Sequence, residues 1–283
     1  MRTEEKTAAG KKFQALLELL GKAGSAVLAF SGGVDSSFLL KAMKTAGVRT
    51  LAVTAVSETL PAREKEKAVS FARQLGMEQR IIRTGELGNE SFASNPPERC
   101  FYCKDELFSK LAAISREEGC GFVFDGTNSD DLRDYRPGRL AAERHGVRSP
   151  LAECGFSKAE IRTMSRELGL DTWDRPSSPC LSSRFAYGTR ITAPALRRVE
   201  KAEEFLEGFG LRDLRVRDDG STARIEVREE DMHILLDARN RRLIAGKLKS
   251  LGYKFVSLDL EGYRSGSLNR VLDRPEAQRP PAR

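Results

Sequence analysis

The stretch from Ala26 to Ser37, AVLAFSGGVDSS, contains the residue types that bind a phosphate group. A short apolar run, 26–30, leads into Ser31, Gly32 and Gly33, and the residues that follow favour a helix. Adjacent glycines let the backbone approach an anion, and the first turn of a helix adds unpaired N–H donors and the positive end of its dipole. The pattern therefore predicts a phosphate-binding loop between a buried strand and a helix.

The polar side chains of this loop extend the prediction to a nucleotide. Ser31, Ser36 and Ser37 offer hydroxyl groups, whereas Asp35 would repel phosphate unless a cation lay between them, so we expect Asp35 to contact Mg²⁺. The loop lacks the lysine of a Walker A loop and is not GxGxxG. It resembles the loop of the PP-loop ATP pyrophosphatases, which implies cleavage of ATP between its α and β phosphates.

The elements around the loop predict an α/β domain with a doubly wound parallel sheet, because apolar strands alternate with helices. Strands are expected at 26–30, 50–56, 79–83 and 121–125, and helices at 13–20, 62–76, 105–118 and, from a Ser-x-x-Glu capping box, 157–168. Ligands of such sheets bind at the carboxyl ends of the strands. A second polar loop, GTNSDD, follows the fourth strand there, so Gly126 and Asn128 are expected beside the nucleotide. A plain Asn/Asp/Gly turn is the alternative interpretation.

The chain changes character after this domain. We expect a first domain at 1–188, a small α+β domain at 189–263, and a disordered tail rich in proline and arginine at 264–283. In the small domain, helices are expected at 194–209 and 231–251, a hairpin at 213–228 and a last strand at 253–258. Arg215 and Arg217 are two apart and share a strand face, where arginine forks suit phosphate. A solvated sheet face is the alternative.

The five cysteines raise the question of a metal or a redox centre. Cys100 and Cys103 form a C-x-x-C in a connection that we expect to be a loop, and such a pair indicates a redox pair, half of a zinc site or part of an iron–sulfur site. Of the others, Cys180 has the most constrained surroundings, Cys120 is expected to pack as a small apolar residue, and Cys154 is undecided. Three thiolates are too few for a closed zinc site but enough for a [4Fe–4S] cluster with one open iron. Zinc and the absence of a metal remain alternatives.

Composition limits the class of protein. The chain has 283 residues, of which 40% are hydrophobic and 31% charged, as is ordinary for a globular protein. No apolar run approaches the length of a membrane span, and the first residues do not form a secretion signal, so we expect a cytoplasmic protein with thiols rather than disulfides. The formal charge of +7 suits a polyanionic ligand, either a nucleotide or RNA.

Several motifs taken together resemble the LarE family of ATP-dependent sulfur transferases, which help to build the nickel-pincer nucleotide cofactor of lactate racemase. They are SGGVDSS, NPPERCFYCK, DGTNSDD, DYRPG, PLAECGFSKAEIR, LGLDTWDRPSSPCLSSRFAYG and RVRDDGSTARIEV, within residues 13–263. The resemblance implies that ATP adenylates a carboxylate of pyridinium-3,5-dicarboxylate mononucleotide and that sulfur then displaces AMP, giving a thiocarboxylate.

The resemblance also implies roles for individual residues. In some members the cysteine at the position of Cys180 gives up its own sulfur and becomes dehydroalanine, so the enzyme works once. Others hold a [4Fe–4S] cluster on three cysteines, and Cys100 and Cys103 place this chain with them. The positions of Ser183, Arg184, Arg215 and Arg217 bind the substrate or its phosphate in the family, and those of Glu203 and Glu226 bind a metal. Cys180, Asp35, Ser183 and Arg184 are thus the expected catalytic residues.

The expected partners follow from this interpretation. We expect a small-molecule nucleotide substrate and a homo-oligomer, with neither a membrane nor a nucleic acid as partner. A tRNA thiolation enzyme is the main alternative, but the sequence has no second C-x-x-C and no basic platform interleaved with aromatic residues. A non-catalytic nucleotide sensor is a third interpretation, which would leave the cysteines unexplained. The sequence does not identify the sulfur source.

Overall fold

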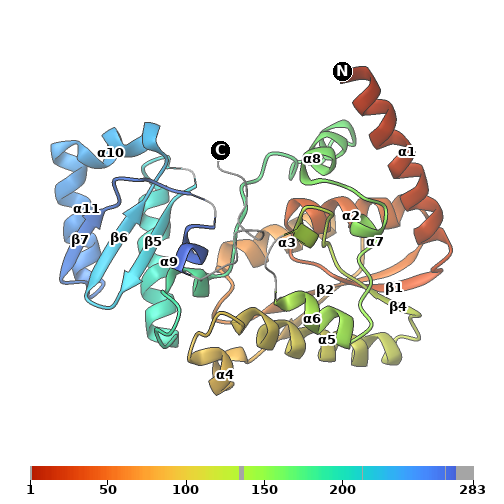
Figure 1. The fold of residues 1–283 in the computed structure, drawn as a ribbon, viewed down its shortest axis with the longest axis horizontal. Helices are drawn as coiled ribbons and strands as arrows, with labels where there is room; N and C mark the ends of the chain where they lie inside the picture. The colour runs from red at the N-terminus through yellow and green to blue at the C-terminus, as the bar shows by residue number, and fades with distance from the viewer. Residues whose placement is uncertain (1, 134–136, 212, 265, 272–283) are drawn as a thin grey trace. The chain divides into compact units, whose positions relative to one another are not determined.

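The computed structural model describes residues 2–133, 137–211, 213–264 and 266–271, which form two compact units (Figure 1). The first unit comprises residues up to 86 and 98–178, and the second comprises 87–97 and the chain from 179 onward. The division after 178 precedes residue 188, where the sequence places the end of the first domain. Segment 87–97 joins the second unit through hydrogen bonds such as that from the Asn95 side chain to the Ala186 oxygen, 2.8 Å.

The first unit is built on a sheet of four parallel strands in the order β3-β2-β1-β4. The strands are β1 (Ser25–Ala29), β2 (Arg49–Val56), β3 (Gln79–Arg83) and β4 (Phe122–Phe124). All four lie where the sequence predicts them, which confirms the α/β class. The strand order reverses direction at β1, since β2 lies on one side of it and β4 on the other. The carboxyl ends of β1 and β4 therefore flank the position at which such sheets bind ligands.

Helices cover both faces of this sheet (Figure 1). The helices α1 (Arg2–Gly21), α2 (Val34–Thr45), α3 (Ala62–Gln74) and α8 (Lys158–Glu167) pack on one face, and α5 (Arg99–Glu117) and α6 (Gly138–Arg144) on the other; α7 (Pro150–Glu153) contacts α1. Along β1, Ala26 and Leu28 belong to the first core and Val27 to the second. Burial on both faces explains why this strand appears in the sequence as an unbroken apolar run.

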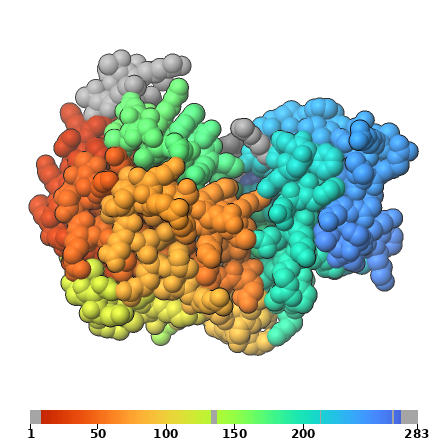
Figure 2. All heavy atoms as spheres, turned by 180° about the vertical axis from the view of Figure 1, so that it is seen from behind, coloured from red at the N-terminus to blue at the C-terminus, as the bar shows by residue number. Residues whose placement is uncertain are grey.

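The second unit contains a three-stranded sheet in the order β5-β6-β7. The strands are β5 (Arg215–Asp219), β6 (Thr222–Glu226) and β7 (Phe255–Leu258); β5 and β6 are antiparallel, and β7 runs parallel to β6. Helices α9 (Ala193–Glu207) and α11 (Ala238–Ser250) contact β5, β7 and each other, so they cover one face of the sheet. Seen from behind, their turquoise and blue atoms form much of the surface of this unit (Figure 2).

The second unit differs from the sequence-based predictions in one helix and in part of the expected tail. The expected helix at 231–251 is interrupted, because Asp237 caps α11 by accepting from the backbone N–H groups of Arg239 and Asn240 and thereby separates it from α10 (Met232–Leu236). Within the expected tail, Ser267–Val271 forms a 3₁₀ helix, and 272–283 lies outside the described residues. None of the helices in the described ranges is long and apolar enough to cross a membrane.

Candidate functional site

The predicted phosphate loop follows β1 and leads directly into α2, as its glycines require. Gly32 has φ +73°, and a Cβ on it would lie 2.9 Å from the Ala68 Cα. Gly33 is the N-cap residue of α2 and, having no side chain, leaves the first turn of the helix without a cap from this position. The hydroxyl of Ser31 lies 3.1 Å from that of Ser36, which also bonds the Gly33 oxygen. The backbone therefore has the close-approach geometry of an anion-binding loop.

The second polar loop lies against the first, where the sequence predicts it. A Cβ on Gly126 would come within 3.0 Å of the Ser36 nitrogen, so a glycine is needed for this approach. Asn128 is buried, and its amide nitrogen lies 3.4 Å from Asp35 Oδ1. Its carbonyl oxygen accepts from the backbone N–H groups of Asp130 and Asp131, which fixes the loop. Asn128 thus connects a rigid second loop to the expected cation-binding carboxylate.

Two basic residues at the phosphate loop are absent from the sequence-based predictions. Lys158 forms an ion pair with Asp35 Oδ2, and Arg175 donates to the Gly32 carbonyl at 3.1 Å. The sequence predicts Lys158 only as part of a helix start and predicts no role for Arg175. The signal that could have found them is the missing Walker lysine, since a triphosphate site without one needs cations from elsewhere in the chain.

Ser37 differs from its neighbours in the loop. Its side chain is fully buried in the first turns of α2, and its hydroxyl has no hydrogen-bond partner among the described residues. Ser31 and Ser36 are closer to the loop backbone, through the bonds given above. Of the three predicted hydroxyl donors, Ser31 and Ser36 therefore lie at the loop, whereas Ser37 is buried in the packing of α2.

The C-x-x-C pair lies on a helix rather than in a loop. Helix α5 begins at Arg99, before the predicted start at Asp105, so Cys100 and Cys103 occupy its first turns three residues apart and share a face. Cys100 is exposed and Cys103 half-buried. The predicted loop at this position is wrong, but a pair on one helical face can bind a common group.

A buried carboxylate lies beside this pair. Glu86 is 3% exposed, and its Oε1 lies 4.0 Å from the sulfur of Cys103. The same oxygen accepts hydrogen bonds from the hydroxyl groups of Ser57, 2.6 Å, and Thr59, 2.8 Å, which follow β2. Glu86 Oε2 has no partner among the described residues. The pair is thus held in a polar corner near the carboxyl end of β2.

The remaining cysteines have different surroundings. Cys120 and Cys154 are half-buried and pack against the two cores of the first unit. Burial, with a smaller contribution from Glu153, raises the pKa of the Cys154 thiol. Cys180 is half-buried in the second unit and precedes a 3₁₀ turn at Leu181–Arg184, where its carbonyl accepts from the Ser183 hydroxyl at 2.9 Å. Among the described residues, no three His, Cys, Asp or Glu side chains are grouped closely enough to hold a metal ion.

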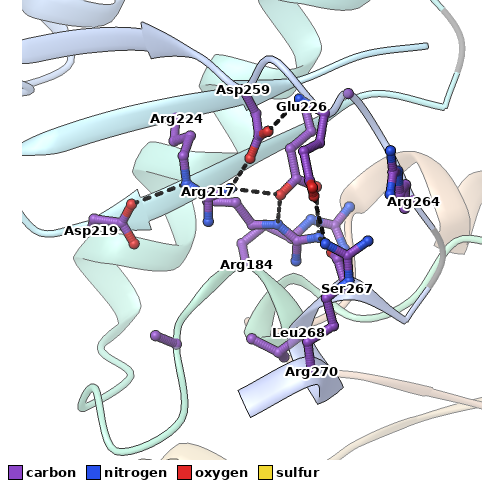
Figure 3. A pocket seen from close by; sticks show the side chains of 13 residues that line it. Arg184, Arg217, Asp219, Arg224, Glu226, Asp259, Arg264, Ser267, Leu268 and Arg270 are labelled. Carbon is purple, nitrogen blue, oxygen red and sulfur yellow. Dashed lines mark hydrogen bonds and ion pairs between the residues drawn. The ribbon is translucent and has the colours of Figure 1, made fainter. Parts of the chain in front are cut away.

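Two of the predicted substrate residues of the second unit, Arg184 and Arg217, line a pocket of about 200 Å³ (Figure 3). Its lining includes Arg184, Arg217, Arg224, Arg264 and Arg270 together with four acidic side chains, Asp219, Glu226, Asp259 and Glu261. The first two arginines are buried, although the sequence predicts a basic sheet face. Such a pocket suits an anion that several guanidinium groups can bind together.

Ion pairs with acidic residues fix these buried arginines. Arg184 donates to both oxygens of Glu203 at 2.9 Å, and Arg217 donates to both oxygens of Glu226 at 2.8 and 2.7 Å. Arg217 also donates to the Ser183 carbonyl at 2.7 Å, which connects β5 to the turn after Cys180. The resemblance implies that Glu203 and Glu226 bind a metal. In this structure their carboxylates instead bind the guanidinium groups of Arg184 and Arg217.

Arg215 is placed apart from this pocket. It is buried, its guanidinium carbon lies 4.8 Å from the centre of the Tyr263 ring, and it donates to the Leu214 carbonyl. Burial, together with repulsion from Arg184 and Arg217, lowers its pKa. The two-residue spacing does put Arg215 and Arg217 on one strand face, but only Arg217 lines the pocket.

Comparison with known proteins finds relatives over most of the chain. It is 37% identical over 254 residues to the pyridinium-3,5-bisthiocarboxylic acid mononucleotide synthase of Lactiplantibacillus plantarum, covering 88% of this chain and 90% of that protein. Uncharacterized proteins of Synechocystis and Methanocaldococcus jannaschii are 43% and 31% identical, covering 92% and 84% of this chain and 98% and 90% of their own lengths. No protein-family model matches.

Proposed function

The chain belongs to the LarE family of sulfur transferases, and we propose that it uses ATP to convert a carboxylate of pyridinium-3,5-dicarboxylate mononucleotide into a thiocarboxylate. The name of the Lactiplantibacillus relative describes the corresponding bisthiocarboxylic product. The observation that carries the proposal is the glycine loop at the reversal point of the sheet, with Asp35 and Asn128 in contact beside it. A loop of this form suits the triphosphate of ATP.

The chemistry requires activation, because a carboxylate is a poor electrophile. In the proposed reaction a carboxylate oxygen attacks the α-phosphorus of ATP, the bond to the β-phosphate oxygen breaks, and pyrophosphate leaves. A sulfur nucleophile then attacks the acyl carbon, and the bond to the AMP oxygen breaks. The loop N–H groups would stabilise charge on the phosphate oxygens, and Asp35 would hold the Mg²⁺ that accompanies ATP.

We assign the phosphate of the mononucleotide to the arginine pocket of the second unit. Arg184 and Arg217 line it, and their acidic partners Glu203 and Glu226 hold the guanidinium groups in fixed positions. Ser183 lies beside them, with its hydroxyl 2.9 Å from Arg184 Nη1. Because these guanidinium groups are already held in place, binding a phosphate costs little side-chain conformational entropy. In this proposal the two acids position arginines rather than a metal.

The sulfur step is proposed to depend on Cys100, Cys103 and Cys180. The first two share a helical face and fit a common metal group, whereas Cys180 belongs to the other unit. We propose that these three thiolates hold a [4Fe–4S] cluster, which would bind an additional sulfide and deliver it to the adenylate. Direct donation from Cys180, leaving dehydroalanine, is the alternative that the same residues allow.

The function is tested by incubating anaerobically purified protein with Mg²⁺–ATP and pyridinium-3,5-dicarboxylate mononucleotide. We expect pyrophosphate and AMP to form, and the mass of the mononucleotide to change by exchange of oxygen for sulfur. Asp35→Ala should abolish both products. Pyrophosphate release that continues undiminished in that variant, or that occurs equally without the mononucleotide, would contradict the proposed reaction.

The sulfur source is tested by measuring iron and acid-labile sulfide before turnover. About four of each per chain, with a broad visible band, would support the cluster. If neither is found after reconstitution, the intact mass of the protein after turnover distinguishes the alternative, because donation from Cys180 removes the elements of H₂S from the chain.

A further inference from the structure

The phosphate loop carries no cation of its own. Between Ser31 and Ser37 the charged residue is Asp35, which is negative. A triphosphate adds several more negative charges to the same place, and backbone N–H groups offset only part of them. Besides the Mg²⁺ that accompanies ATP, positive charge must therefore come from residues outside the loop, and two basic side chains of the first unit contact the loop.

Lys158 is the first of these basic residues, and contacts of its backbone fix its position. It is the first residue of α8, where the capping box of Ser157 and Glu160 sets the start of the helix. Its backbone N–H donates to Asp130 of the second polar loop at 2.8 Å. The ammonium group pairs with Asp35, while 36% of the side chain remains exposed. The base of the side chain is thus anchored, and its charged end lies at the loop within reach of solvent.

Arg175 is the second, and another arginine holds it. Arg162 of α8 donates to the backbone oxygens of Trp173 and Arg175 at 2.7 and 2.6 Å. This bracing positions the Arg175 guanidinium, whose Nη1 donates to the Gly32 carbonyl at 3.1 Å. Gly32 belongs to the predicted phosphate loop, so the guanidinium lies at the loop where the phosphates are expected.

We propose that Lys158 and Arg175 bind the triphosphate of ATP and supply the positive charge that a Walker lysine provides in other nucleotide loops. The ligand follows from the proposed function; the two residues follow from their contacts with the loop. Both belong to the segment 157–175, so α8 and the turn after it act as the basic wall of the nucleotide site. The competing explanation is that the ion pair with Asp35 only joins α8 to α2.

The test compares equilibrium binding of ATP, inorganic pyrophosphate and AMP, each with Mg²⁺ and without the sulfur acceptor, by titration calorimetry. Lys158→Met keeps the aliphatic stem and removes the charge. We expect it to weaken binding of ATP and pyrophosphate about tenfold or more, as for loss of one charge-assisted hydrogen bond, and binding of AMP less than about twofold. Lys158→Arg should restore most of the affinity, and Arg175→Ala should resemble Lys158→Met.

Lys12→Ala is the matched control. Lys12 forms an ion pair of 2.7 Å with Glu160 on the same helix, so its loss disturbs the attachment of α8 without removing charge from the loop. It should leave all three affinities unchanged. A similar loss of ATP affinity in Lys12→Ala and Lys158→Met, or an equal loss for ATP and AMP, would show that α8 only supports the fold.

Unchanged or tighter ATP binding by Lys158→Met would also overturn the inference, because Asp35 would then be the only member of the ion pair that matters to the nucleotide. These measurements are independent of sulfur transfer. A chain that binds ATP as expected but yields no thiocarboxylate would contradict the proposed function alone. A chain that makes thiocarboxylate with ATP affinity independent of Lys158 would contradict the present inference alone.

Discussion

Gly32 shows at the scale of one residue why the phosphate loop has its sequence. Its φ of +73° strains any residue with a Cβ, and the added carbon would also meet Ala68 at 2.9 Å. Gly24 has a similar φ of +66° but nothing within 4 Å of the added Cβ. A residue with a Cβ would therefore be similarly strained at either position, but only at position 32 would it also clash with a neighbouring residue.

This pair gives the first prediction. Gly24→Ala should lower the free energy of unfolding by about 1–2 kcal/mol, the cost of a left-handed residue, and leave ATP binding unchanged. Gly32→Ala should cost more and should also weaken ATP binding at least tenfold, because the loop must shift to relieve the contact with α3. Chemical denaturation and titration calorimetry measure both effects. Equal ATP affinity in the two variants would show that the loop does not need this close approach.

The cysteines give a second prediction at this scale. Cys103→Ser should lose most of the bound iron, because losing even an outer-sphere partner of a metal site typically weakens metal binding about 10- to 100-fold. Pyrophosphate release should persist, since adenylation does not use this residue. Cys154→Ser is the control, as Cys154 packs against the core of the first unit and burial raises its pKa. Iron analysis of both variants decides; full iron in Cys103→Ser would remove it from the proposed ligand set.

At the scale of elements, the most informative difference from the sequence-based prediction is the start of α5. The Asn-Pro-Pro sequence correctly excludes helix at residues 95–97, but the predicted start of the next helix at Asp105 comes later than the observed start. In the structure the helix begins at Arg99, and Phe101 packs against the core under the sheet. This tertiary contact decides the conformation of the segment and cannot be found from local residue preferences.

Helix α8, by contrast, is predicted correctly from its capping box. Glu160 accepts from the Ser157 N–H at 2.8 Å and from Lys12 at 2.7 and 2.8 Å. Burial opposes ionisation, but the hydrogen bonds from Lys12 and Ser157 outweigh it and lower the pKa of Glu160. A carboxylate whose pKa is lower in the folded chain contributes stability above its unfolded pKa, and this contribution is lost as the pH falls through the folded value.

Glu160→Gln should therefore lower the free energy of unfolding at pH 7 by about 0.5–1 kcal/mol, because both partners are partly exposed and screened. The difference between variant and wild type should shrink as the pH falls below about 4.3 and vanish once the folded group is protonated. Urea denaturation at several pH values measures it. A difference that stays constant with pH would mean that the charge of Glu160 contributes nothing.

At the scale of the whole molecule, periodicity predicts the elements but not the long-range pairing of charges. The alternation along β5 and β6 places Arg215 and Arg217 on one face, as expected. Arg217 is buried in an ion pair with Glu226 of the neighbouring strand, and Arg184 in an ion pair with Glu203 of α9, so a face that looks solvated in the sequence belongs to a network of buried charges. Lys158 and Arg175 reach the phosphate loop by the same kind of long-range packing.

The two units also have separate cores, which makes their stabilities separable. In the second unit, Asp218 is 2% exposed and accepts from Arg198 at 2.8 and 2.7 Å and from the Tyr253 hydroxyl at 3.0 Å. Burial and the charge of Asp218 raise the pKa of Tyr253. Removing this carboxylate would take away the ion pair of Arg198 and the hydrogen bond of the Tyr253 hydroxyl. The neighbouring Asp219, by contrast, is exposed and lies 3.5 Å from Arg224.

Asp218→Ala should cost about 3–5 kcal/mol, as expected when one member of a buried ion pair is removed, and Asp219→Ala less than about 1 kcal/mol. Hydrogen exchange followed by mass spectrometry should show faster exchange in α9, β5 and β6 of the Asp218 variant. The strands of the first unit and its affinity for ATP should be unchanged, because its two cores contain none of the residues of the second. Equal acceleration in both units would instead show that the chain unfolds as one cooperative body.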